Sequence, residues 1–133
     1  MLEEQLEKRK FLNKAGAYSV KKHSRSILES LNYSAEILSS PEHMVMMFPQ
    51  GHFESLYERD FSFARGIGRI IDRSEPQLQI VFNINLVDYF SKQAPTLFIR
   101  CHTYQGSRAL DDIEKAFNQF HMTCISKQNE QLV

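Results

Sequence analysis

The chain has 133 residues, 42% of them hydrophobic and 24% charged, which predicts one ordinary globular domain. Lys plus Arg equal Asp plus Glu at 16 each, so no net charge attracts the chain to nucleic acid, and we expect no nucleic-acid role. The apolar runs are far shorter than the roughly 20 residues that span a bilayer, and the polar start is no signal peptide. We therefore expect a cytoplasmic protein.

The first half of the chain reads as helix, strand, helix, strand. Leucine and phenylalanine side chains among charges predict a helix over residues 2–13, and Gly16–Val20 is a short β-prone run. Ser24 or Ser26 caps a helix whose apolar residues recur at helical spacing through Leu38. Met44–Phe48 then gives a second strand. A strand, a helix and a strand in this order predict a right-handed crossover with parallel strands.

The second half continues with helices and strands. We predict a polar loop, a helix, two strands and a final helix at residues 49–62, 64–73, 78–86, 96–104 and 107–124. We expect residues 126–133 to fray. The predicted fold class is therefore α/β, a mostly parallel or mixed sheet flanked by helices within a single domain over residues 1–133.

Two stretches carry the strongest functional signal. Met44–Gly51 reads as a buried strand that ends in a Pro-x-Gly turn, and Phe61–Gly68 reads as a loop that enters a helix. A turn glycine after a strand lets the backbone approach a ligand closely. Ligands of α/β enzymes bind beyond the ends of such strands.

These stretches resemble the glycerolipid acyltransferase family, typified by bacterial 1-acylglycerol-3-phosphate acyltransferase. Phe48–Gly51 is similar to the family's Phe-Pro-Glu-Gly block, and Phe63–Gly66 to a Phe-Lys-Lys-Gly-like segment about a dozen residues later. Gly16–Lys22 resembles the preceding Gly-x-Phe-x-Val-Asp-Arg-like block. The resemblance covers roughly residues 11–75. It implies transfer of a fatty acyl group from acyl-CoA or acyl carrier protein to a lysolipid hydroxyl in phospholipid biosynthesis, with possible peripheral contact at the inner membrane face and no cofactor.

The family's catalytic motif, His-x-x-x-x-Asp, is missing. In that motif a histidine deprotonates the acceptor hydroxyl while the aspartate orients the imidazole. None of the five histidines in this chain has an aspartate five residues later. We therefore assign no catalytic residue. We expect either a chain that begins inside a longer acyltransferase or a relative without its catalytic front half, inactive in isolation.

The resemblance implies a substrate-binding site around the two turns. Its expected residues are Lys22, Pro49, Gln50, Gly51, His52, Ser55, Arg65 and Gly66. Gln50 replaces the usual glutamate, and Phe53 stands where many members carry an arginine, which weakens the case for a phosphate-bearing acceptor. For Lys22 we prefer a solvated surface cation at a strand end, and for Arg65 the alternative to a site residue is a surface cation at a helix start.

Other candidate residues have structural explanations that we prefer. His52 and Glu54 form a tempting acid–base pair, but the spacing supplies no orienting partner, so we expect an exposed loop histidine. The aromatic residues Phe11, Tyr57, Phe61 and Phe63 either line an acyl-chain groove or belong to the core. His102 and His121 are interpreted as hydrogen-bonded packing residues. Cys101 and Cys124 are interpreted as reduced core residues, and no spacing predicts a metal site.

Two alternatives to the enzyme stay open. The first is a non-catalytic α/β module that binds lipid or a partner protein. The second is an unrelated small domain with a chance Phe-Pro-x-Gly, which predicts that Gly16, Gly51 and Gly66 lie far apart. Whether the chain is part of an enzyme or a binding module, an incomplete sheet would leave an open edge, so we expect copies of the chain to associate.

Overall fold

The structure, a computed structural model, describes residues 11–14, 16–18, 26–52, 54–55 and 58–130. The chain groups into two compact units, one of residues 1–46 and 69–76, the other of residues 47–68 and 77–133. Each unit is described by itself. The predicted helix over residues 2–13 lies largely outside the described residues, where α2 (Phe11–Lys14) is its visible part.

The first unit is built around α3 (Ser26–Ile37), which confirms the helix predicted from Ser26. Its polar side chains tie it to neighbouring segments of the same unit. The Ser34 hydroxyl bonds the Tyr18 hydroxyl, and Asn32 Oδ1 accepts hydrogen bonds from Arg69 and Arg73 of α4 (Gly66–Arg73). Ala35, Ile70 and Ile71 are buried, so the apolar spacing in the sequence does mark buried faces.

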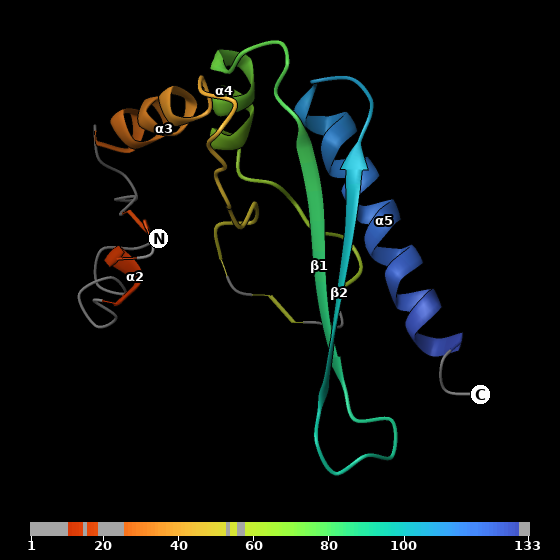
Figure 1. Cartoon of the computed structure of the whole chain (residues 1–133). Helices are drawn as coiled ribbons and strands as arrows, with labels where there is room; N and C mark the ends of the chain where they lie inside the picture. The colour runs from red at the N-terminus through yellow and green to blue at the C-terminus, as the bar shows by residue number, and fades with distance from the viewer. Residues whose placement is uncertain (1–10, 15, 19–25, 53, 56–57, 131–133) are drawn as a thin grey trace. The chain divides into compact units, whose positions relative to one another are not determined.

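The second unit is a long antiparallel hairpin with a helix beside it (Figure 1). β1 (Ile80–Asp88) pairs with β2 (Thr96–Tyr104) along the full length of both strands, from Ile80 opposite Tyr104 to Asp88 opposite Thr96. α5 (Leu110–Glu130) contacts both strands. Alternate residues of β1 face this helix, and the core consists mainly of Phe82, Ile84, Leu86, Ile113, Phe117 and Cys124.

The expectation of a mostly parallel or mixed sheet is wrong for the described residues, whose sheet is two-stranded and antiparallel. The connection between the strands, residues 89–95, explains the direction. A parallel crossover needs a dozen or more residues, whereas a short turn joins only antiparallel strands. The α/β character itself is confirmed.

The predicted strand Met44–Phe48 does not form. The segment has no strand beside it in the described part of the chain, and Met44, Met46 and Phe48 are 70–84% exposed. The alternation that predicted a strand is present, because Val45 and Met47 are the less exposed residues. A strand also needs a neighbour that accepts its backbone hydrogen bonds. Gly16–Val20 lies partly outside the described residues, and Gly16 to Tyr18 form no strand.

The last helix extends further than the sequence predicted. We expected fraying from Ser126, but α5 continues to Glu130. Its last turns bury Cys124 and Gln128, which gives them tertiary contacts that helix propensity alone does not reveal. Among the described residues, no helix is long and apolar enough to cross a bilayer.

Candidate functional site

The two motif stretches meet. The Ala64 amide donates a hydrogen bond to the Pro49 carbonyl at 2.8 Å. Gly51 adopts a φ of 72°, and a Cβ placed there would lie 3.8 Å from the Ala64 Cβ, an ordinary contact. Glycine is therefore favoured at this turn by its backbone conformation rather than by lack of space. The parts of the stretches that meet, residues 47–51 and 61–68, belong to the second unit.

Polar side chains of α5 hold the second stretch in place. Asn118 uses both ends of its amide on Phe61: Oδ1 accepts from the Phe61 amide at 2.9 Å, and Nδ2 donates to the Phe61 carbonyl at 3.0 Å. The Glu114 carboxylate accepts from the Phe63 amide at 2.6 Å. The segment leading to Ala64 thus receives from a helix the hydrogen bonds that a neighbouring strand would normally supply.

The phenylalanine side chains of this stretch contact aromatic residues of α5. Phe61 is buried and meets the rings of Phe117 and His121 edge-on, with ring centroids 6.0 and 4.7 Å apart. Phe63 lies 5.2 Å from Phe117 in a similar arrangement. They pack against α5 rather than lining an acyl-chain groove. Tyr57 lies outside the described residues, and Phe11 is exposed in the other unit.

His52 has the orienting partner that the sequence did not reveal. Its Nε2 lies 2.7 Å from Oε1 of Glu54, and its Nδ1 lies 3.0 Å from the Gln50 carbonyl oxygen. Both neighbours are acceptors, so both contacts are hydrogen bonds at once only when both ring nitrogens carry protons. The predicted exposure is confirmed, with 56% of the His52 side chain accessible. In this arrangement neither nitrogen is open to take a proton from a substrate.

The other expected site residues are distributed around the turn. Pro49 and Gln50 are half-buried, and Arg65 is exposed immediately before Gly66, the first residue of α4. Ser55 is exposed, and its carbonyl accepts a hydrogen bond from the Glu58 amide. Lys22 lies outside the described residues.

Two of the three motif glycines, Gly51 and Gly66, belong to the second unit. Gly51 lies beside Ala64, two residues before Gly66. Gly16 belongs to the first unit, whose position relative to the second is not defined. Phe53, the position of the missing arginine, also lies outside the described residues.

Two titratable side chains of α5 have perturbed pKa values. Burial lowers the pKa of His121, which is 4% exposed, and burial raises the pKa of the Cys124 thiol, against the effect of the Arg100 and Lys127 charges. The His121 Nδ1 has no hydrogen-bond partner among the described residues, so His121 packs as predicted but without this predicted hydrogen bond. Cys101 is exposed, so its assignment to the core is wrong; Cys124 is buried, and both thiols are free.

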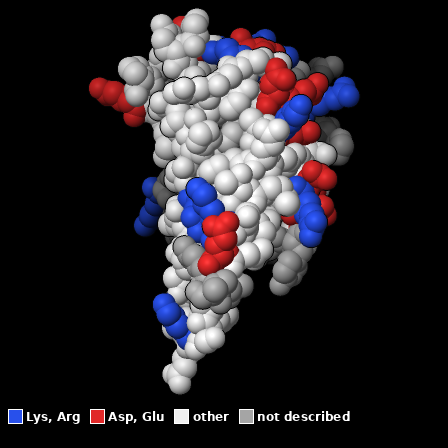
Figure 2. Space-filling view, turned by 90° about the vertical axis from the view of Figure 1, so that its right-hand side faces the viewer, with Lys and Arg blue, Asp and Glu red and all other residues white. Residues whose placement is uncertain are grey.

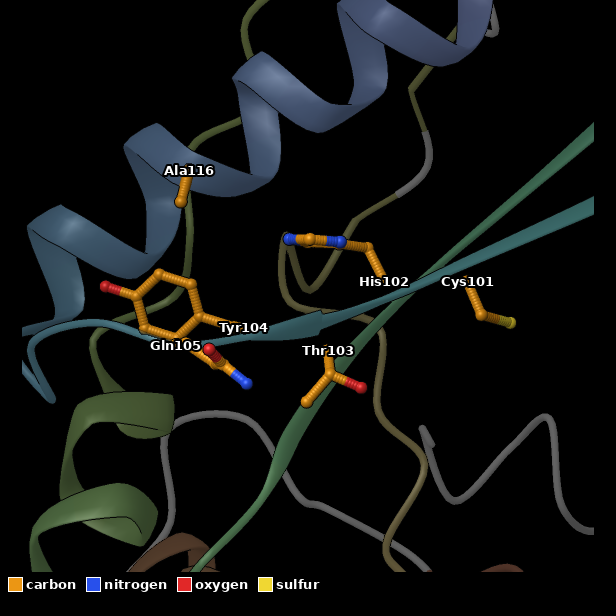
Figure 3. Close-up of a pocket in the computed structure, with 6 residues that line it drawn as sticks. All are labelled: Cys101, His102, Thr103, Tyr104, Gln105 and Ala116. Carbon is orange, nitrogen blue, oxygen red and sulfur yellow. The ribbon is translucent and has the colours of Figure 1, made fainter.

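A shallow groove of about 660 Å³ lies elsewhere on the second unit (Figure 3). It follows the end of β2 and is lined by Cys101, His102, Thr103, Tyr104, Gln105 and Ala116. His102 and Tyr104 point toward α5, whereas Cys101 and Thr103 point to the other side of the strand (Figure 3). No motif in the sequence predicts this groove. It forms only because the end of β2 packs beside Ala116 of α5 in the folded protein.

The described residues contain no group of three metal-ligating side chains. On the face shown in Figure 2, basic and acidic side chains are interspersed, and no broad field of one sign covers the part of it that the structure describes. Comparison with protein-family models, curated proteins and solved structures finds no match for the chain.

Proposed function

We propose that this chain is the acceptor-binding part of a glycerolipid acyltransferase, which moves a fatty acyl group from acyl-CoA or acyl carrier protein to a lysolipid hydroxyl. The observation that carries the proposal is the hydrogen bond between Ala64 and Pro49, which joins the two family-like stretches into one turn. A chance Phe-Pro-x-Gly has no reason to lie against the second stretch.

The turn has the properties that acceptor binding requires. Gly51 and Arg65 are exposed at its surface, so a headgroup reaches both without displacing core residues. The turn is also held from behind, because Asn118 and Glu114 fix the backbone at Phe61 and Phe63. A backbone fixed before the ligand arrives loses less conformational entropy on binding. We assign Arg65 to an anionic group of the lysolipid and Gln50 to a neutral polar group.

The transfer step needs a base that this sequence does not contain. The acceptor hydroxyl must lose its proton as its oxygen attacks the thioester carbonyl, and the thiolate of the carrier leaves. His52 does not supply the base in this conformation, because both of its ring nitrogens face acceptors. The proposal therefore assigns the base to a histidine outside this sequence. We infer that the chain acts in the cytoplasm, with peripheral contact at the membrane that holds its lipid substrate.

Acyl transfer and lysolipid binding test the proposal separately. The chain is mixed with an acyl-CoA thioester and lysophosphatidate, and released thiol is measured. We expect release at the uncatalysed rate; turnover like that of a complete acyltransferase would contradict the assignment of the base. Binding without turnover, unchanged when a histidine-containing amino-terminal part of an acyltransferase is added, would favour the non-catalytic lipid-binding module.

The binding measurement has a matched charge control. We expect Arg65→Gln to weaken lysophosphatidate binding by about two- to fivefold, the effect of losing one exposed charge contact. Lys92→Gln removes a cation from the exposed end of the hairpin and is expected to leave binding unchanged. Equal effects of the two substitutions would remove Arg65 from the site.

A further inference from the structure

Among the described residues, no strand lies beside the outer edge of β2. In the described part of the chain the sheet contains only β1 and β2, so the edge of β2 that faces away from β1 presents backbone groups with no sheet partner. Such an edge is a template for another extended chain. The groove of Figure 3 follows this edge from Cys101 to Gln105.

The groove is suited to an extended backbone rather than to a charged ligand. Five of its six lining residues are consecutive: the last four residues of β2 and Gln105, which follows the strand. The sixth, Ala116, has a small side chain that leaves room beside α5. None of the lining residues is a lysine, arginine, aspartate or glutamate. The site therefore offers strand pairing and neutral contacts.

The face of the hairpin turned away from α5 is also uncharged. Its cross-strand pairs are Val81–Thr103, Asn83–Cys101, Asn85–Ile99 and Val87–Leu97. The four aliphatic side chains among them are 52–62% exposed. Lysine and proline, the residues that commonly protect an edge, are absent from β2. The ionisable Arg100 and His102 are directed to α5, where they meet Gln128 and Phe120.

We propose that the groove binds the same strand of a second copy of this chain. Two β2 strands related by a twofold axis run antiparallel. The same backbone groups of each copy then form hydrogen bonds with those of the other. The order becomes β1-β2-β2-β1, and the two uncharged faces join into one continuous surface. Equal numbers of acidic and basic residues give no net repulsion between copies. The groove offers no charged side chain to a partner, and the segment Cys101–Gln105 of the second copy contains no lysine, arginine, aspartate or glutamate.

The pairing forms a weak, reversible dimer. One pair of strands buries less than the roughly 1,200–2,000 Å² of a standard stable interface. Sedimentation equilibrium of the full chain over about 5–500 µM, a range that covers micromolar affinities, measures the dissociation constant. We expect a monomer–dimer equilibrium. Hydrogen exchange at the two ends of this range is expected to show slower exchange of amides in residues 101–105 when the chain is concentrated.

Two pairs of variants locate the interface. Thr103→Lys places a charge at the edge strand, and its control Val81→Lys places the same charge directly opposite, one strand further from the axis. Ala116→Arg fills the groove, and its control Met122→Arg adds the same side chain at an exposed position of α5 outside the lining residues. We expect the first member of each pair to raise the dissociation constant tenfold or more, and the controls to change it less than about threefold.

Circular dichroism establishes that each variant is folded before its association is compared. A chain that stays monomeric over the whole range would overturn the proposal. So would a dimer that is insensitive to both Thr103→Lys and Ala116→Arg, or one without protection of residues 101–105. Growth into oligomers larger than dimers would contradict the closed twofold pairing. None of these outcomes depends on the acyltransferase proposal.

Discussion

At the scale of single residues, His121 is a titratable ring inside an aromatic core. It lies edge-on to Phe61, and burial lowers its pKa. The neutral imidazole fits this environment, whereas the protonated ring brings a charge into it without a partner for Nδ1 among the described residues. The same side chain that completes the core therefore makes it sensitive to acid.

We predict that the free energy of unfolding falls as the pH is lowered through the His121 titration. The folded-state pKa lies below the ordinary value of 6.5, so the neutral ring's contribution is fully present above pH 6.5 and is lost as the pH falls through the folded-state pKa. Urea unfolding at a series of pH values measures how steeply the free energy of unfolding changes with pH. We expect His121→Phe to flatten this slope and His43→Gln, at an exposed histidine, to leave it unchanged. A slope equally steep in His121→Phe would show that another group causes it.

At the scale of elements, α5 stabilises the segment that carries part of the proposed site. Phe61 is buried, and both of its backbone polar groups bond to Asn118. The contact joins residues 57 positions apart in the sequence. Buried backbone groups that lose their partners destabilise a fold more than an average hydrogen bond stabilises it.

Asn118→Ala is therefore expected to lower the free energy of unfolding by about 2–3 kcal/mol, through two unpaired backbone groups. Gln119→Ala, at the exposed neighbouring position, is expected to change it by less than about 0.5 kcal/mol. Urea denaturation of the three proteins gives the comparison. If Asn118→Ala were as mild as its control, α5 would not be the anchor of the Phe61 segment.

The turn between β1 and β2 contains two residues with positive φ angles. The Lys92 amide bonds the Tyr89 carbonyl at 2.8 Å, and the two residues between them, Phe90 and Ser91, have φ angles of 41° and 65°. Positive φ at both central positions is the type I′ pattern, which glycine adopts more readily than serine. The Asp88 carboxylate helps to hold this turn by accepting from the amides of Tyr89 and Phe90.

We expect Ser91→Gly to stabilise the protein by about 0.5–1 kcal/mol, since relief of backbone strain exceeds the entropy that glycine loses on folding. Gln93→Gly changes a residue of the same connection that has no positive φ, and we expect it to destabilise slightly. Thermal unfolding of both variants and the unsubstituted chain measures these stability changes. A loss of stability in Ser91→Gly would contradict the turn geometry.

At the scale of the whole molecule, local patterns predicted the elements but not their pairing. The helix from Ser26 and the strand Thr96–Tyr104 are confirmed, and the helix predicted over residues 64–73 is present from Gly66, because residues buried on one face of an element recur at its characteristic spacing. The parallel arrangement was wrong because Met44–Phe48 has strand composition but no described neighbour to pair with. The connection after Asp88 is too short for a parallel crossover, so its length already indicated antiparallel strands.

The candidate site was likewise predictable only in part from the sequence. The pair of family-like stretches indicated which residues belong together, and Pro49 does meet Ala64. The supports of the site, Asn118 and Glu114, were not predictable, because single polar residues on a helix do not identify distant backbone partners. The Glu54 contact of His52 was missed for a different reason: a two-residue spacing in a loop has no fixed geometry. The single-domain expectation and the acyltransferase assignment stay predictions.

The most direct test of the central claim, that the joined turn at Pro49–Gly51 and Ala64–Gly66 binds a lysolipid, is an NMR titration. The isotopically labelled chain is titrated with short-chain lysophosphatidate below its micelle concentration, and backbone amide shifts are followed. We predict the largest shifts at Gly51, Ala64 and Gly66. Gly51→Ala, which costs about 1–2 kcal/mol at a φ of 72°, should abolish them, and the helical control Gly68→Ala should retain them. Shifts confined to other regions, or no shifts, would contradict the account.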